Sequence, residues 1–199
     1  MKSFWINKAG NKSLILFFSG WSVEPSQMKF LKSDGYDVAM FYSYSSFEVK
    51  EEVDFSKYSE VIAVLYSFGV FVGLNFLEKK GFNGEIFVVN GTMKPIDDQF
   101  GIKKIIFEKT FENLNEETFG EFQKNMFLNA EDYKKFILSS TDAHDVNELK
   151  QELAFIRNNL EKEIETTLNV KKIFISKRDK IFFFKNQVDF WKKFQLCSC

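Results

Sequence analysis

The chain has 199 residues, 45% hydrophobic and 28% charged, which fits one globular domain, residues 1–199, with a continuous core. Its 27 basic and 28 acidic side chains give a formal net charge of -1, which argues against nucleic acid or an anionic membrane as a partner. The amino-terminal residues form no apolar run of signal-peptide length, and nowhere do about 18 apolar residues run without a charge. We therefore expect a cytoplasmic protein that does not span a membrane.

Short apolar runs, separated by polar or amphipathic stretches, occupy the first half of the chain. Each run is almost continuously apolar, which is typical of parallel strands that crossover helices cover on both faces. The runs are residues 14–18, 37–42, 61–66 and 85–90, and a fifth is found at residues 171–176. This alternation predicts an α/β fold with a mostly parallel sheet.

Helical patterns fill the chain between the fourth and fifth runs. Two apolar faces recur there at helical spacing: Phe119, Phe122 and Met126, and then Leu149, Leu153, Ile156 and Leu160. The second helix is predicted to begin at Asp145, where an N-cap acid is followed three residues later by Glu148 in a capping-box pattern. We interpret residues from about 111 to 168 as a helical insertion before the last strand.

Ser67 marks the point where the third apolar run ends and a helical pattern begins, in VIAVLYSFGVFVGLNF. This junction predicts a nucleophile elbow, a sharp turn that lifts a serine hydroxyl above the carboxyl edge of the sheet. The G-x-S-x-G pattern is half kept, since Gly69 supplies the second glycine and Leu65 occupies the first place. The leucine fits if its backbone keeps a negative φ. The alternative is a serine that caps an ordinary helix.

A second turn ends the first apolar run, in LILFFSGWS, at the same carboxyl edge of the predicted sheet. An α/β-hydrolase takes one oxyanion amide from the residue after its nucleophile, here Phe68, and another from the loop after an early strand. The second amide is then that of Trp21. The alternative is a plain turn at Gly20 and Trp21, whose ring packs on the core.

Taken together, these segments resemble the small α/β-hydrolases of the BioG type, the pimeloyl-[acyl-carrier-protein] methyl ester esterases of biotin synthesis. The resemblance covers nearly the whole chain and rests on LILFFSGW, YSFGVF, NGTMKPIDDQFGI, FQKNMF and RDKIFFFKNQVDFW. It implies a small α/β-hydrolase fold in which the helical insertion is a lid over an acyl pocket. It also implies a Ser-His-Asp esterase, with Ser67 as nucleophile, that needs no metal or organic cofactor.

Asp179 is the predicted acid of this triad. It follows the last apolar run, in SKRDK, and it comes after Ser67, as the hydrolase chain order of nucleophile, acid and histidine requires. The alternative is a solvated turn residue among basic neighbours.

The histidine departs from the family pattern. The sequence holds one histidine, His144, and it precedes Asp179. The family carries its catalytic histidine beyond the NQxxFW segment, where this chain continues with KKFQLCSC. We therefore predict that esterase activity is impaired, and we interpret His144 as an exposed or helix-flanking residue between Asp142 and Asp145, outside the triad. Cys197 and Cys199 are predicted to be free thiols that hold no metal.

The resemblance implies that the partner is an acyl carrier protein bearing the substrate. We also expect that small-molecule esters bind and that the protein is a monomer. Carriers are acidic, so basic residues of the insertion are candidates for docking, although each also fits the solvated face of a helix. These residues are Lys124, Lys134, Lys135 and Arg157. Two other functions stay open: a non-catalytic protein that binds an acyl chain or carrier, and an esterase or thioesterase for another acyl substrate.

Overall fold

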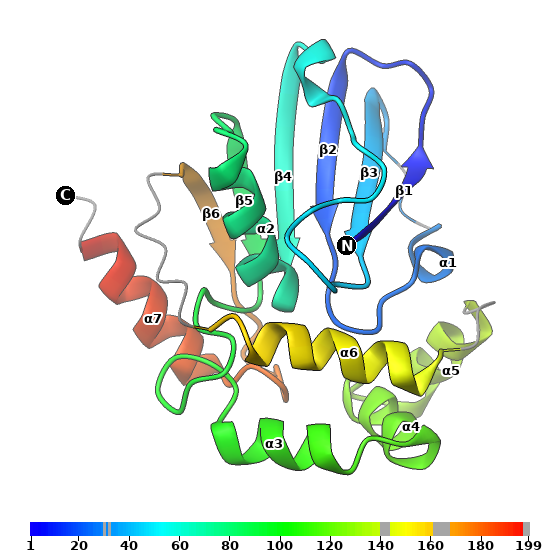
Figure 1. Cartoon of the computed structure of the whole chain (residues 1–199), viewed down its shortest axis with the longest axis vertical. Helices are drawn as coiled ribbons and strands as arrows, with labels where there is room; N and C mark the ends of the chain where they lie inside the picture. The colour runs from blue at the N-terminus through cyan, green and yellow to red at the C-terminus, as the bar shows by residue number, and fades with distance from the viewer. Residues whose placement is uncertain (30, 32, 140–143, 161–167, 197–199) are drawn as a thin grey trace.

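The computed structural model describes residues 1–29, 31, 33–139, 144–160 and 168–196. Within these ranges, six strands form one sheet in the order β1-β3-β2-β4-β5-β6 (Figure 1). The strands are β1 (Lys2–Asn7), β2 (Ser13–Phe18), β3 (Tyr36–Tyr42), β4 (Glu60–Tyr66), β5 (Glu85–Val89) and β6 (Val170–Phe174). β1 pairs with β3 in the antiparallel sense, and the other neighbouring pairs are parallel. The predicted mostly parallel α/β sheet is therefore confirmed.

The five predicted runs coincide with β2 to β6, whereas β1 lies outside them. β1 pairs from Lys2 with Tyr42 to Asn7 with Val38, at the edge of the sheet. The amine of Met1 donates to the carbonyl oxygen of Glu48 at 2.7 Å and helps to hold the start of this strand. These contacts are distant in sequence, so local periodicity does not reveal them.

The sequence predicted that helices cover the strands on both faces of the sheet, and for most strands this prediction is wrong. Along β2, residues alternate between full burial and partial exposure, as they do at the end of β4 and in β5; β3 is buried on both faces. Helix α2 (Phe68–Lys79) packs against β2 and β4. The β2–β3 connection contains only the four-residue α1 (Pro25–Met28) within its described part, which explains the weaker cover.

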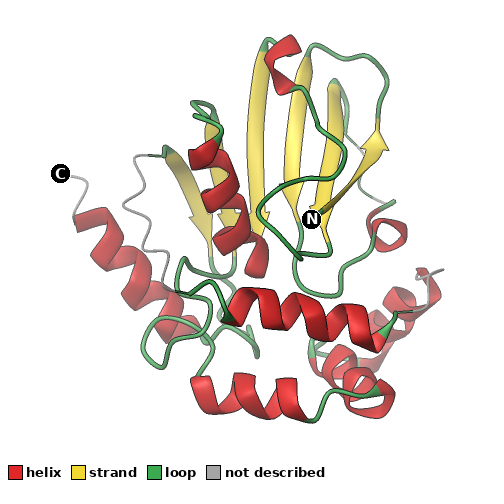
Figure 2. Cartoon of the chain, in the orientation of Figure 1, coloured by secondary structure: helices red, strands yellow, loops and turns green. Residues whose placement is uncertain are grey.

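The helices between β5 and β6 gather beyond the carboxyl ends of the parallel strands, below the sheet in Figures 1 and 2. They are α3 (Lys104–Glu112), α4 (Glu116–Asn125), α5 (Ala130–Ser139) and α6 (Val146–Arg157). After β6 the chain forms α7 (Phe184–Leu196), and a 3₁₀ turn, η1 (Phe55–Lys57), precedes β4. None of the helices in the described ranges combines the length and the apolar character needed to cross a bilayer.

The start of α6 confirms the predicted N-cap residue but not the predicted capping box. Asp145 is the N-cap, and its carboxylate accepts from the backbone N–H of Asn147 at 2.8 Å. Glu148 does not complete a capping box, because its carboxylate pairs with Lys2 at 3.0 Å. The ion pair therefore ties α6 to the start of β1.

Candidate active site

Ser67 lies on a strained strand-to-helix turn between β4 and α2. Its backbone has φ 58° and ψ -126°, a conformation that costs about 1–3 kcal/mol for a residue with a side chain. The backbone N–H of Ser67 donates to the carbonyl oxygen of Asn90 at 2.9 Å, so the loop after β5 supports the turn. Because Ser67 makes no side-chain hydrogen bond as an N-cap, the capping alternative is not supported.

The residues around Ser67 explain how Leu65 is accepted in place of glycine. The sequence interpretation requires that Leu65 avoid a positive φ, and the structure meets this condition. The side chain of Leu65 is fully buried. A Cβ built on Gly73 would lie 2.6 Å from Cδ2 of Leu65, so the leucine fills the space that Gly73 leaves open. A Cβ on Gly69 would overlap the carbonyl oxygens of Phe18 and Ser19. Gly69 thus permits the close approach of α2 to the end of β2.

We expect Gly69→Ala to destabilise the fold by about 1–3 kcal/mol, because the added methyl group meets rigid backbone atoms. Gly120→Ala is the matched control. Gly120 lies inside α4 with open space around its Cα, so alanine there should stabilise the helix by up to about 1 kcal/mol. Urea unfolding of both variants measures the difference. Equal stabilities would contradict the close contact at the elbow.

The predicted oxyanion residues flank the serine. A Cβ on Gly20 would lie 3.1 Å from Cβ of Ser67, so the backbone that enters Trp21 passes directly beside the candidate nucleophile. Phe68 is the first residue of α2, where a backbone N–H has no acceptor within the helix. The Trp21 ring also packs on the core, and its indole N–H donates to the carbonyl oxygen of Leu149 at 3.1 Å. Helix α6 therefore fixes the Trp21 turn.

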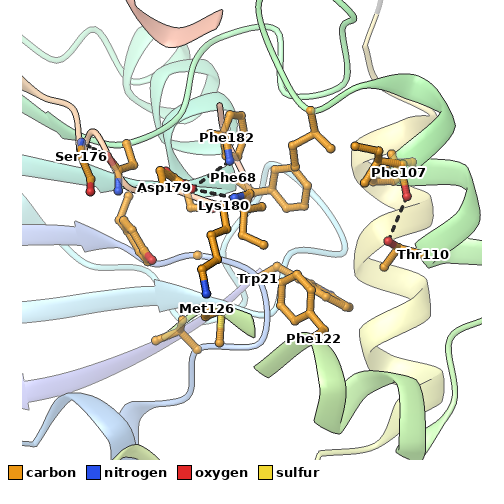
Figure 3. A pocket seen from close by; sticks show the side chains of 18 of the residues that line it. Trp21, Phe68, Phe107, Thr110, Phe122, Met126, Ser176, Asp179, Lys180 and Phe182 are labelled. Carbon is orange, nitrogen blue, oxygen red and sulfur yellow. Dashed lines mark hydrogen bonds between the residues drawn. The ribbon is translucent and has the colours of Figure 1, made fainter. Parts of the chain in front are cut away.

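A cavity of about 310 Å³ brings the predicted site residues together (Figure 3). Ser67, Asp179, Trp21 and Phe68 all line it. Apolar side chains make up much of the remaining wall, including Ile102, Ile106, Phe107, Phe122, Met126, Leu153, Ile181 and Phe182. Asp179 and Phe182 lie on one side, across from Phe107 of α3 in Figure 3. The cavity thus lies between the carboxyl edge of the sheet and the helices beyond it.

Asp179 is held by backbone and side-chain donors in the loop after β6. Its Oδ1 accepts from the backbone N–H groups of Ile181 at 2.8 Å and Phe182 at 2.9 Å. Its Oδ2 accepts from the side-chain amide of Gln187 at 3.3 Å. Burial raises the pKa of the Asp179 carboxyl, and these hydrogen bonds oppose that effect. Asp179 is half-buried and fixed in orientation, so the solvated-turn alternative is not supported.

The structure does not bring His144 to this cavity. Among the described residues that line it, none is a histidine. His144 flanks the start of α6, as one of the two predicted alternatives has it, and its side chain is half-buried instead of exposed. Its ring packs edge-on against Phe119, with centroids 5.0 Å apart. Tyr66 lines the cavity beside Ser67, but burial and the charge of Asp179 raise the pKa of its phenol, which argues against a base at neutral pH.

Glu152 is a buried acid behind the candidate site that the sequence interpretation missed. It lies on α6 with 5% of its surface exposed, and burial raises its pKa to about 8. The carboxyl faces the backbone N–H groups of Tyr44 and Ser22, which lower the pKa, while the charge of Glu24 raises it. Ser22 has φ 64° and directly follows Trp21. The sequence held one signal of this burial, since position 152 falls on the apolar face of its helix.

The fold and the elbow geometry can be compared with those of known protein families. The fold is that of an α/β-hydrolase, with a strained serine at the elbow and an acid after a later strand. The family model described as "Pimeloyl-ACP methyl esterase BioG" matches residues 1–198. The chain therefore belongs to the BioG family.

Solved structures of other proteins also resemble this chain. The crystal structure of BioG from Haemophilus influenzae superposes with a TM-score of 0.86 at 29% identity, over 97% of this chain and 88% of that one. An esterase from Exiguobacterium antarcticum matches with a TM-score of 0.62 at 14% identity, over 96% and 81% of the two chains, which shows the fold alone.

A longer relative is a malonyl-[acyl-carrier protein] O-methyltransferase of Bacteroides fragilis (strain 638R). It is 31% identical over 184 residues, or 92% of this chain. The chain spans 37% of that protein's length.

Proposed function

We propose that the protein is a serine carboxylesterase that hydrolyses the methyl ester of a pimeloyl chain attached to an acyl carrier protein. The observation that carries this proposal is the joint placement of Ser67 and Asp179 on one largely apolar cavity, with Trp21 and Phe68 beside the serine. The cavity volume of about 310 Å³ falls within the range of small-molecule sites. BioG family membership supplies the substrate class.

In the proposed reaction, the Ser67 hydroxyl attacks the ester carbonyl, and the backbone N–H groups of Trp21 and Phe68 stabilise the oxyanion that forms. Methanol leaves, and water then releases the pimeloyl group from the serine. An imidazole is required to take the serine proton and return it to the methoxide. In this proposal, Asp179 is the acid that orients the imidazole. His144 does not fill this role, so we propose that hydrolysis by this chain is slow.

A fluorophosphonate probe tests Ser67 directly. We expect the probe to label Ser67 in preference to other serines, because the elbow exposes its hydroxyl to the cavity and the oxyanion amides stabilise the adduct. Mass spectrometry of digested protein locates the label. Ser67→Ala should remove it, while Ser22→Ala, a nearby buried serine that also has a positive φ, should retain it. A non-catalytic binding protein would show no preference for Ser67.

The proposal also includes a surface on which the acyl carrier protein docks. Of the candidate lysines and arginine, Arg157 pairs with Glu108 at 3.1 Å and Lys135 pairs with Glu131 at 2.9 Å. Lys124 on α4 and Lys134 on α5 are both exposed, and neither is among the described residues that line the cavity. We therefore propose Lys124 and Lys134 as docking residues for the acidic carrier.

We expect the double reversal Lys124→Glu with Lys134→Glu to lower kcat/KM on the carrier-bound ester about tenfold at low salt, by removing electrostatic attraction. Turnover of free dimethyl pimelate should change little. The control is Lys8→Glu with Lys12→Glu, in the loop before β2 and at the opposite edge of the sheet. Equal losses on carrier-bound and free esters would count against docking at this surface.

A further inference from the structure

Gln187 is a fully buried amide that joins two segments of the candidate site. Its Oε1 accepts from the backbone N–H of Gly91 at 2.7 Å. Its Nε2 donates to the carbonyl oxygen of Phe182 at 2.6 Å and to Oδ2 of Asp179 at 3.3 Å. The Gly91 N–H can only donate and the Phe182 carbonyl can only accept, so the orientation of the amide is fixed. The side chain is 0% exposed.

Gly91 connects this amide to Ser67. It has φ 103°, and a Cβ built on it would lie 2.6 Å from the carbonyl oxygen of Ser67. No larger residue fits between the loop after β5 and the elbow. One turn further along α7, the indole N–H of Trp191 donates to the carbonyl oxygen of Gly91 at 3.0 Å. Helix α7 therefore holds Gly91 through both its N–H and its carbonyl, directly behind the serine.

We infer that Gln187 is a positioning residue that fixes the Asp179 carboxylate relative to the Ser67 elbow. The inference rests on the proposed function for the roles of Asp179 and Ser67. Gln187 is not among the described residues that line the cavity, so it acts through Gly91, Phe182 and Asp179 and not on the substrate. A hydrogen bond from an amide to the carboxylate also favours the ionised form that must orient an imidazole.

The primary test is a carbon-13 NMR titration of the Asp179 carboxyl, which does not depend on activity. Gln187→Met keeps the length of the side chain and removes the donor, so we expect it to raise the pKa of Asp179. Asn186→Ala is the matched control. Asn186 is the neighbouring residue on α7, and its amide donates to the carbonyl oxygens of Gly101 and Asp98. Its replacement should leave the Asp179 titration unchanged.

The second readout is the kinetics of fluorophosphonate labelling. We expect Gln187→Met to lower the maximal labelling rate constant of Ser67 about 10- to 100-fold. The variant loses the acceptor for the Gly91 N–H behind the elbow, and a small displacement of the serine has effects of that size. The apparent affinity for the probe should stay the same, since Gln187 does not line the cavity. A loss of affinity with an unchanged maximal rate would overturn the positioning role.

Other outcomes are also decisive. A folded Gln187→Met variant whose Asp179 titrates as in the wild type would refute the inference. If this variant does not fold, Gln187→Leu replaces it, because leucine is shorter and also lacks the donor to Asp179. If neither folds, the role of Gln187 is structural and the inference is wrong. If Ser67 is never labelled in the wild type, the proposed function fails, while the titration still decides the inference.

Discussion

Supplying an imidazole base to this site is expected to raise ester hydrolysis by orders of magnitude. A triad enzyme without its base loses about 10⁶-fold in turnover and keeps only about 10³–10⁴-fold acceleration over water. The 199-residue chain should show that residual level, because its one histidine packs against Phe119 and not beside Ser67. The measurement is turnover of the pimeloyl methyl ester by two proteins: the chain alone, and the chain with a histidine-containing segment fused behind α7.

Three variants separate this explanation from general destabilisation. Ser67→Ala should abolish the gain in the fused protein, since the serine is the proposed nucleophile. Asp179→Asn should reduce the gain, because the base then lacks its orienting carboxylate. His144→Ala should leave the rate of the unfused chain unchanged. If the unfused chain already turns over at about 1–10³ s⁻¹, the ordinary range for enzymes, the missing-base hypothesis is wrong.

Glu152 is expected to make the protein markedly less stable as the pH rises from about 4.5 to about 8. Burial raises its pKa from 4.5 to about 8 in the folded state. The folded protein therefore binds a proton more tightly than the unfolded chain, and this stabilisation is complete below about pH 4.5. It is lost as the pH rises toward 8. With 1.36 kcal/mol for each pH unit between the two values, the loss is on the order of 5 kcal/mol.

Comparison with Glu152→Gln isolates this effect from other groups, including the nearby Met1 amine, whose pKa is lowered by burial. Glutamine is neutral throughout, so the variant should approach the wild type in stability near pH 5 and exceed it near pH 8. Urea midpoints at the two pH values measure both. The control is Glu148→Gln, on the exposed side of the same helix, which should change stability by less than about 1 kcal/mol. Parallel pH profiles for the wild type and Glu152→Gln would contradict a buried neutral acid.

The strands and the elbow were predictable from sequence because their signals are local. Each apolar run from β2 to β6 is bounded by polar residues within a few positions, and burial of such runs depends mainly on their own composition. Ser67 sits between a strand pattern and a helix pattern that adjoin it directly. The positive φ of Ser67 follows from that local turn. The close approach of Gly69 does not, because the carbonyl oxygens that it meets belong to Phe18 and Ser19 at the end of β2. The N-cap at Asp145 is local, like the turn at Ser67.

The amino-acid sequence by itself thus determined the parallel sheet, the elbow and the candidate nucleophile and acid, since periodicity and turn chemistry act over a few residues. Only the tertiary structure decided which distant groups meet. It pairs β1 with β3, places Gln187 between Gly91 and Asp179, and buries Glu152 behind the Trp21 turn. The physical reason is that hydrogen-bond partners and desolvation depend on groups far apart in the chain, such as Gly91 and Gln187, whose separation of 96 residues no local pattern records.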